Sequence, residues 1–130
     1  MEITLGTVQF GMSYGVSNKG GELSSKKIQK ICEKFRCYGF NSFDTARSYG
    51  NSEKELSNVL RDGDIITTKI APNLNQYPSK DWIDVSLNKS LSELKIEGVE
   101  TLLFHRSTDL CSVPLKILEK KVLDLKSDGI

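Results

Sequence analysis

The sequence predicts an α/β fold in which four parallel strands alternate with four helices over residues 1–130. Four short runs of apolar or β-branched residues are each followed by a stretch with apolar residues at helical spacing. The connections between these segments are short, which favours right-handed crossovers between neighbouring parallel strands. A chain of 130 residues, 38% of them hydrophobic, is sufficient for one domain.

The first predicted strand runs from Ile3 to Val8, and a loop rich in Gly, Ser and Asn follows from Gln9. The loop contains no GK[ST] sequence, which argues against a phosphate-binding P-loop and favours an ordinary surface loop. A helix capped by Ser24 or Ser25 comes next, and Gly39 suits the C′ position after it. The predicted buried stripe of this helix consists of Ile28, Ile31, Cys32 and Phe35.

The second unit places a carboxylate at the end of a strand. Residues Phe40 to Phe43 predict a buried strand that stops at Asp44, and Tyr49 lies in the loop beyond it. Ser52, with Glu55 three positions on, is predicted to form a capping box that starts a helix reaching about residue 61. The buried side of that helix is predicted to consist of Leu56, Val59 and Leu60.

The last two strands also end next to polar side chains. The third strand is predicted over Ile65 to Ile70, with Lys69 near its end. The fourth is predicted over Val99 to Phe104, and His105 follows it directly. Their short β-branched and apolar runs are typical of strands in a parallel sheet whose two faces are covered.

Two further helices accompany these strands. Ser79 is expected to cap the first of them, and Ser112 or Pro114 is expected to open the second. Each carries apolar residues at helical spacing that are predicted to face inward. They are Ile83, Leu87, Leu91 and Leu94 in the first helix and Leu115, Leu118, Val122 and Leu125 in the second.

Three side chains at the strand ends are predicted to converge. Asp44, Lys69 and His105 stand at the carboxyl ends of strands two, three and four, and the carboxyl ends of parallel strands lie on one rim. Tyr49 belongs to the loop after the second strand and can reach the same place. Each residue alone has an ordinary structural explanation as a cap, a packing residue or a solvated strand end. Their joint occurrence at strand ends favours a catalytic site.

Four segments, in order along the chain, resemble the aldo-keto reductase family. FDTARSYGNSE at 43–53 is similar to the family signature, in which an Asp and a Tyr stand five residues apart after the second strand. LGTVQFG at 5–11, TTKI at 67–70 and LLFHRS at 102–107 agree with the family as well. The resemblance implies a (β/α)8 barrel of the TIM type, of which residues 1–130 would be the first four βα units, the N-terminal half.

The resemblance implies NADPH-dependent reduction of an aldehyde or ketone. Tyr49 would donate the proton to the carbonyl oxygen, and the Lys69 ammonium would favour the phenolate that remains. Asp44 would supply the negative charge that a partly enclosed ammonium needs, and His105 would donate a hydrogen bond to the substrate oxygen. Gly6, Thr7 and Asp44 are the candidate cofactor contacts.

A complete barrel of this type takes about 250 residues. In the family, the second half holds most of NADP(H), so the 130-residue chain is expected to be inactive alone. The alternative is a non-catalytic half-barrel that forms a homodimer or binds a complementary half through its open strand edges. The strand faces are also expected to expose apolar side chains. We therefore predict that the chain associates with a partner or aggregates. A phosphate-handling isomerase barrel is less favoured, because its phosphate site normally uses loops after strands seven and eight.

Composition excludes several other classes of protein. A net charge of +1 gives no electrostatic reason to expect nucleic-acid binding. No apolar run is long enough for a membrane span, and no signal peptide is visible, so a cytoplasmic protein without membrane contact is expected. Three cysteines without metal-ligand spacing fit reduced thiols in that compartment. Cys32 is predicted to lie in the core, and Cys37 and Cys111 to be partly exposed.

Overall fold

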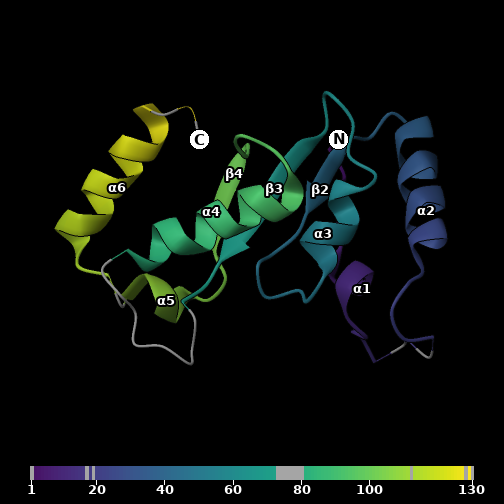
Figure 1. The fold of residues 1–130 in the computed structure, drawn as a ribbon, viewed down its shortest axis with the longest axis horizontal. Coiled ribbons are helices and arrows are strands. Elements are labelled where there is room, and N and C mark those ends of the chain that lie inside the picture. Colours follow the sequence, from purple (N-terminus) through teal and green to yellow (C-terminus); the bar gives the residue numbers. More distant parts are fainter. Residues whose placement is uncertain are drawn as a thin grey trace.

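A computed structural model of the chain describes residues 2–16, 18, 20–72, 81–111, 113–127 and 129. Strands and helices alternate along most of the chain, as predicted (Figure 1). The strands are β1 (Thr4–Gly6), β2 (Ser42–Asp44), β3 (Ile65–Ile70) and β4 (Thr101–Phe104). The helices are α1 (Val8–Gly11), α2 (Ser25–Cys37), α3 (Ser52–Ser57), α4 (Trp82–Leu94), α5 (Ser107–Cys111) and α6 (Leu115–Ser127).

The strands form one parallel sheet in the order β1-β2-β3-β4. Consecutive strands are therefore neighbours, which is the arrangement of a sheet that begins to curl into a (β/α)8 barrel. The registers align Gly6 with Asp44 and Asp44 with Thr67, and further along the sheet Lys69 with Leu103. The predicted α/β half-barrel with four parallel strands is confirmed.

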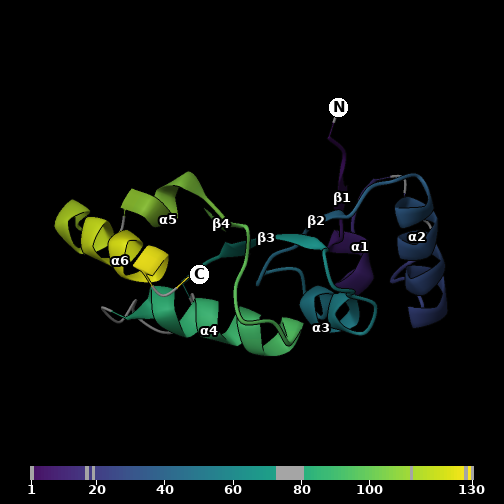
Figure 2. The same cartoon turned by 90° about the horizontal axis from the view of Figure 1, so that it is seen from above.

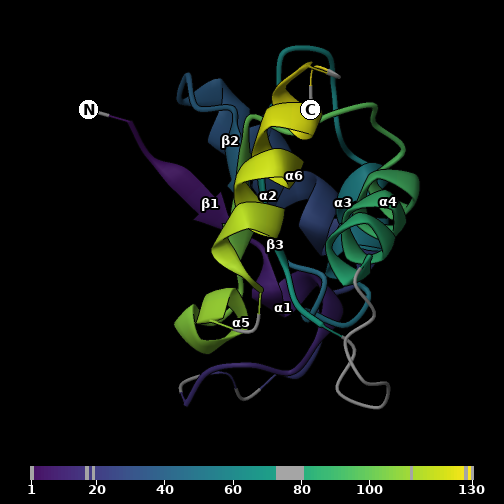
Figure 3. The ribbon, with the colours of Figure 1, turned by 90° about the vertical axis from the view of Figure 1, so that its left-hand side faces the viewer.

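Two helices, α3 and α4, cover one face of this sheet, and α2 and α6 flank it (Figure 2). Seen from above, α3 and α4 lie on the same side of the strands, with α2 beyond the β1 side and α6 beyond the β4 side (Figure 2). Viewed from the β4 side, α6 is nearest the viewer (Figure 3). No helix among the described residues is long and apolar enough to cross a membrane.

Two apolar clusters fill the space between the sheet and the helices. One joins side chains from β2 and β3 with side chains from α1, α2 and α3, and the other joins β3 and β4 to α4 and α6. The fully buried members include Phe43, Ile28 and Leu56 in the first cluster and Ile70 and Leu87 in the second. The predicted stripes of α2 and α4 lie in these clusters. Cys32 is buried in the first, as predicted, while Cys37 and Cys111 are exposed.

The opposite face of the sheet is largely polar, which corrects the expectation of a large exposed apolar surface. Side chains alternate along each strand, so the large apolar ones turn toward the helices and those between them turn away. The outward set includes Thr4, Ser42, Asp44, Thr67 and Lys69, and Thr4 and Ser42 share a hydrogen bond of 3.0 Å. Leu103, with 41% of its surface exposed, and the partly buried Ile65 are the large apolar exceptions within the strands.

Element boundaries differ from the predictions at several places. β3 has the predicted bounds, whereas β1 and β4 are shorter and β2 begins later and includes Asp44. Two short helices were not predicted, α1 within the expected surface loop and α5 directly after the fourth strand. Helices of four and five residues show too little periodicity to be recognised in a sequence. α3 ends at Ser57, earlier than expected.

Helix termini gave one correct prediction and one error. Gly39 follows the C-cap of α2 with a φ of 83°, as a C′ glycine should. The capping box at Ser52 is wrong, because Asn51 is the N-cap and the Ser52 hydroxyl bonds to the distant Thr7 instead. Asp81 is the N-cap of α4. Ser79 and Ser112, the expected caps of the last two long helices, lie outside the described residues.

The inward face of α6 is only partly buried. Leu118 and Leu125 pack against the second cluster, as predicted, but Leu115 and Val122 are 68% and 43% exposed. Lys121 of this helix also reaches Asp84 of α4 at 2.6 Å. The expectation that Leu115 and Val122 face inward is therefore wrong.

Candidate active site

The strand ends bring the predicted residues together on one rim. Asp44 is the last residue of β2, Lys69 is the penultimate residue of β3, and His105 follows β4 directly. The sheet continues past β4 at this point, because the His105 backbone N–H donates to the Ile70 carbonyl at 2.8 Å. The rim is thus built by backbone pairing, and the side chains follow from their positions along the strands.

Lys69 lies at the centre of this rim. Its ammonium forms an ion pair with the Asp44 carboxylate and donates a hydrogen bond of 3.2 Å to the Thr45 carbonyl. It also lies 5.2 Å from the centre of the Tyr49 ring. The Lys69 side chain is 17% exposed, so the charge is mostly withdrawn from water and depends on these partners.

Tyr49 and His105 face each other across the rim. Their ring centres are 5.8 Å apart with an interplanar angle of 78°, an edge-to-face contact. His105 Nδ1 is buried and has no hydrogen-bond partner among the described residues. A buried N–H without an acceptor is costly, so the neutral ring is best protonated on Nε2. That tautomer makes Nε2 a hydrogen-bond donor.

A close backbone contact holds the Tyr49 loop against α1. A Cβ added to Gly11 would stand 2.0 Å from the Ser52 backbone nitrogen and 2.3 Å from the Tyr49 backbone carbonyl oxygen. Gly50 has a φ of 57°, and its own Cβ would stand 2.3 Å from the Gly11 oxygen. Asn51 donates its N–H to that oxygen at 3.3 Å. Only glycine fits at these two positions, because the opposing atoms are backbone.

The candidate cofactor residues at the end of β1 differ from each other. Gly6 is exposed, pairs in register with Asp44, and has no heavy atom within 4 Å of the place where a Cβ would be. Thr7 is fully buried, and its hydroxyl donates to the Asp44 carbonyl at 3.0 Å and bonds the Ser52 hydroxyl at 2.8 Å. Gly6 therefore leaves open space beside Asp44, while the Thr7 hydroxyl is engaged within the protein.

A charged network beside the rim, centred on the buried Glu53 carboxylate, was missed in the sequence. The Arg47 Nη1 donates to Glu53 at 2.8 Å and to Glu93 at 2.7 Å, and Thr68 donates to Glu53 at 2.8 Å. Burial disfavours the Arg47 charge, but the hydrogen bonds to Glu93 and Glu53 outweigh it, and the guanidinium pKa is raised. One signal was available, because Glu53 precedes Leu56 by three residues and so shares its buried face.

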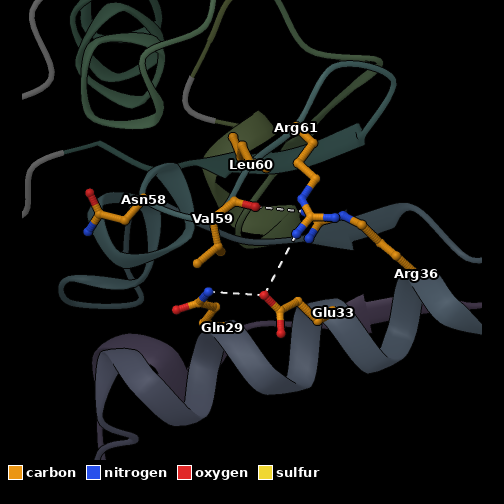
Figure 4. A pocket seen from close by; sticks show the side chains of 7 residues that line it. All are labelled: Gln29, Glu33, Arg36, Asn58, Val59, Leu60 and Arg61. Atoms are coloured by element: carbon orange, nitrogen blue, oxygen red, sulfur yellow. Dashed lines mark hydrogen bonds and ion pairs between the residues drawn. The ribbon is translucent and has the colours of Figure 1, made fainter.

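A separate hollow lies between α2 and the end of α3 (Figure 4). Its charged side chains have partners, since Arg36 pairs with Asp64 beside the hollow and Arg61 approaches Glu33 at 3.8 Å. Gln29 also donates to Glu33 at 3.0 Å. The hollow shares no residue with the rim. The Arg36–Asp64 ion pair beside it connects α2 to the residue before β3. Within the described residues, no group of His, Cys, Asp or Glu side chains is arranged to hold a metal ion.

Comparisons with known proteins agree on one family. The family model described as the aldo/keto reductase family matches residues 2–124. The NAD(P)H-dependent D-xylose reductase of Candida tenuis is 31% identical over 88 residues. A solved structure from Pseudomonas aeruginosa, assigned to the aldo-keto reductases, superposes with a TM-score of 0.74 at 29% identity. An aldo-keto reductase from Bacillus halodurans has the same fold, with a TM-score of 0.66 at 20% identity.

The chain spans only part of these relatives. The match covers 60% of the chain and 26% of the xylose reductase. The superpositions cover 97% of the chain and 51% of the Pseudomonas protein, and 92% of the chain and 41% of the Bacillus protein. The chain therefore corresponds to about half of a solved relative.

Proposed function

This chain belongs to the aldo/keto reductase family, and we propose that it carries the proton-transfer groups of an NADPH-dependent carbonyl reductase. The observation that carries the proposal is the position of the Lys69 ammonium, which contacts the Asp44 carboxylate and lies 5.2 Å from the Tyr49 ring centre. Proton transfer to a carbonyl oxygen needs a hydroxyl that can give up its proton, a cation beside it and an anion that balances the cation; Tyr49, Lys69 and Asp44 supply these three groups at one rim.

Tyr49 is the proposed general acid. As negative charge builds on the carbonyl oxygen of the substrate, the Tyr49 hydroxyl transfers its proton to that oxygen. The O–H bond of Tyr49 breaks, and an O–H bond forms on the substrate. The phenolate that remains is stabilised by the Lys69 ammonium, which acts in a partly dehydrated place where charge interactions are strong. Asp44 holds that ammonium in position through their ion pair.

His105 is the proposed orienting group. With its proton on Nε2, the ring donates a hydrogen bond to the substrate oxygen, and its edge contact with Tyr49 sets the angle of approach. The two rings would thus hold the carbonyl oxygen between them. Aldehydes and ketones are the substrate class that this pair suits, because the oxygen needs both a donor and a proton.

NADPH is the proposed cofactor, and it would supply the hydride that adds to the carbonyl carbon. The described residues fit a flat ring at this rim in one respect, since the sheet face beside Asp44 is open at Gly6. Gly6, Thr7 and Asp44 remain the proposed cofactor contacts, Thr7 through its backbone position because its hydroxyl is occupied. We propose that residues 1–130 are the N-terminal half of the barrel and that activity requires the remaining strands.

We also propose a cytoplasmic location, which the three unpaired cysteines support.

Replacing Tyr49 by Phe in a complete enzyme that contains this segment tests the assignment. The variant keeps the ring packing and removes the proton, so kcat should fall by at least about a hundredfold. Tyr38→Phe is the matched control, because Tyr38 is 70% exposed at the end of α2, and its kcat should not change. Near-full activity in Tyr49→Phe would remove Tyr49 from the reaction.

The sheet edges favour a second candidate function, a half-barrel that associates with another half-barrel. Within the described sheet, β1 and β4 each pair with a single strand, so each keeps an open edge. Two copies related by a two-fold axis could pair β4 of one with β1 of the other twice and form eight strands. A separate complementary half could do the same.

A further inference from the structure

Arg47 connects the Tyr49 loop to the interior of the protein. It stands between Asp44 and Tyr49 in the sequence, yet its side chain is directed away from the reacting groups. One nitrogen, Nη1, contacts the carboxylates of Glu53 on α3 and Glu93 on α4, at 2.8 and 2.7 Å. The loop that carries the proposed acid is therefore attached to two helices through one guanidinium.

Glu53 is the most deeply placed member of this network. Its side chain is 1% exposed, and its two carboxylate oxygens have different partners. Oε2 accepts from Arg47, and Oε1 accepts from the hydroxyl of Thr68, which is fully buried in β3. A carboxylate this far from water needs both partners, since an unpaired buried charge is strongly unfavourable.

The backbone of the loop is attached to the same strand. The Arg47 N–H donates to the Lys69 carbonyl at 2.9 Å, directly beside the Thr68 side chain that bonds Glu53. The loop is thus held to β3 at two adjacent residues, once through its backbone and once through the Arg47–Glu53 pair. Tyr49 follows Arg47 by two positions, and its N–H donates to the Ala46 carbonyl at 3.0 Å, so its backbone belongs to the same hydrogen-bonded segment.

We infer that Arg47 and Glu53 are positioning residues whose ion pair holds the Tyr49 ring beside Lys69 and His105. The consequence for proton transfer rests on the proposed function, whereas the position of the ring does not. Buried ion pairs are poor sources of net stability, because removing two charges from water offsets most of their attraction. Their geometry is nevertheless exacting, which suits a part that fixes one loop in one place.

Glu53→Gln tests this inference. The amide keeps the size of the side chain and an oxygen for Thr68, but it removes the charge that pairs with Arg47. Glu33→Gln is the matched control, since Glu33 is a 43% exposed acid on α2 that approaches Arg61 at 3.8 Å. Glu93→Gln is a milder second variant, because Glu93 is 29% exposed and its loss leaves the Glu53 contact in place.

The first measurement needs no activity. His105 is the single histidine of the sequence, so its ring protons are readily assigned by NMR, and a nuclear Overhauser cross-peak to the Tyr49 ring reports the distance between the rings. We expect this cross-peak in the parent and in Glu33→Gln, a reduced one in Glu93→Gln, and none in Glu53→Gln. If Glu53→Gln does not fold, Arg47→Gln removes the other member of the pair: a lost or reduced peak in a folded Arg47→Gln supports the inference, and an unchanged peak overturns it.

The second measurement uses a complete enzyme that contains this segment. Glu53→Gln should lower kcat about tenfold with little change in KM, because the Tyr49 ring is displaced while the other substrate contacts remain. An unchanged cross-peak in a folded Glu53→Gln, or no cross-peak in the parent, overturns the positioning role. A cross-peak that is lost as expected in an enzyme that reduces no carbonyl supports the positioning role and refutes the proposed function alone.

Discussion

Gly11→Ala should be strongly destabilising, because the new methyl group has no room. Its carbon would stand 2.0 Å from the backbone nitrogen of Ser52, 2.6 Å from the backbone nitrogen of Asn51 and 2.3 Å from the carbonyl oxygen of Tyr49. Real Cβ contacts essentially never fall below 3.0 Å, so the two segments must separate by about 1 Å at their closest point. All three opposing atoms are backbone, so no rotation of a side chain can relieve the clash.

The cost follows from what that separation breaks. Forcing a methyl group into a packed site costs about 1–3 kcal/mol. The Ser52 hydroxyl donates to the Thr7 carbonyl at 2.8 Å, and Asn51 donates to Gly11 at 3.3 Å. Each hydrogen bond is worth about 1 kcal/mol, so the total loss should be about 3–5 kcal/mol. That is a large share of the stability of an ordinary domain, about 5–15 kcal/mol.

Urea unfolding followed by the fluorescence of Trp82 measures the loss. Trp82 is the single tryptophan, is 7% exposed and packs edge-on against Phe104, so its emission reports the folded state. With an m-value of about 1.5 kcal/mol/M, the midpoint should fall by about 2 M or more. Gly20→Ala is the control, because the nearest atom to its Cβ lies 3.8 Å away. Equal midpoints for the two variants would refute the steric argument.

Three further predictions concern the chain as a whole. The 130-residue chain should bind NADPH with a dissociation constant well above the micromolar range; fluorescence titration measures it, and low micromolar affinity, about −8 kcal/mol, would contradict the proposed division of the cofactor site. It should form a dimer or bind a complementary half in size-exclusion chromatography with light scattering, whereas a monodisperse 14.5 kDa monomer that unfolds cooperatively would exclude association through the strand edges. Burial raises the pKa of the Cys32 thiol to about 11, so at pH 8 a thiol reagent should modify Cys37 and Cys111 rapidly and Cys32 only after unfolding; three rapidly reacting thiols would show that the first cluster opens.

Much of the site could be predicted because it is read from strand ends. Asp44, Lys69 and His105 each stand at the carboxyl end of a recognisable strand, and parallel strands carry such positions to one rim whatever the intervening residues are. The Arg47 network could not be predicted in the same way. Its bonds reach Glu93, 46 residues away, and depend on how α4 lies over the loop. No local pattern specifies a partner at that distance.

The wrong predictions for the start of α3 and for the inward side of α6 have the same origin. Ser52 and Glu55 satisfy the local rule for a capping box, but the Ser52 hydroxyl is buried against Thr7, 45 residues away, and Glu55 accepts from Ser25 instead. Leu115 and Val122 lie at the helical spacing of an inward stripe, yet α6 packs through Leu118 and Leu125 and leaves the first two exposed. Local rules describe what a side chain can do, and tertiary neighbours decide which of those contacts it makes.

The sequence by itself determined the α/β class, the order of the strands and the identity of the four rim residues, because periodicity and strand ends are local properties of the chain. Only the tertiary structure decided that the open sheet face is largely polar, that the Thr7 hydroxyl is occupied, and that Arg47 of the Tyr49 loop pairs with the buried Glu53 carboxylate. Those features depend on close contacts between segments far apart in the sequence, whose geometry is set by packing of the whole fold.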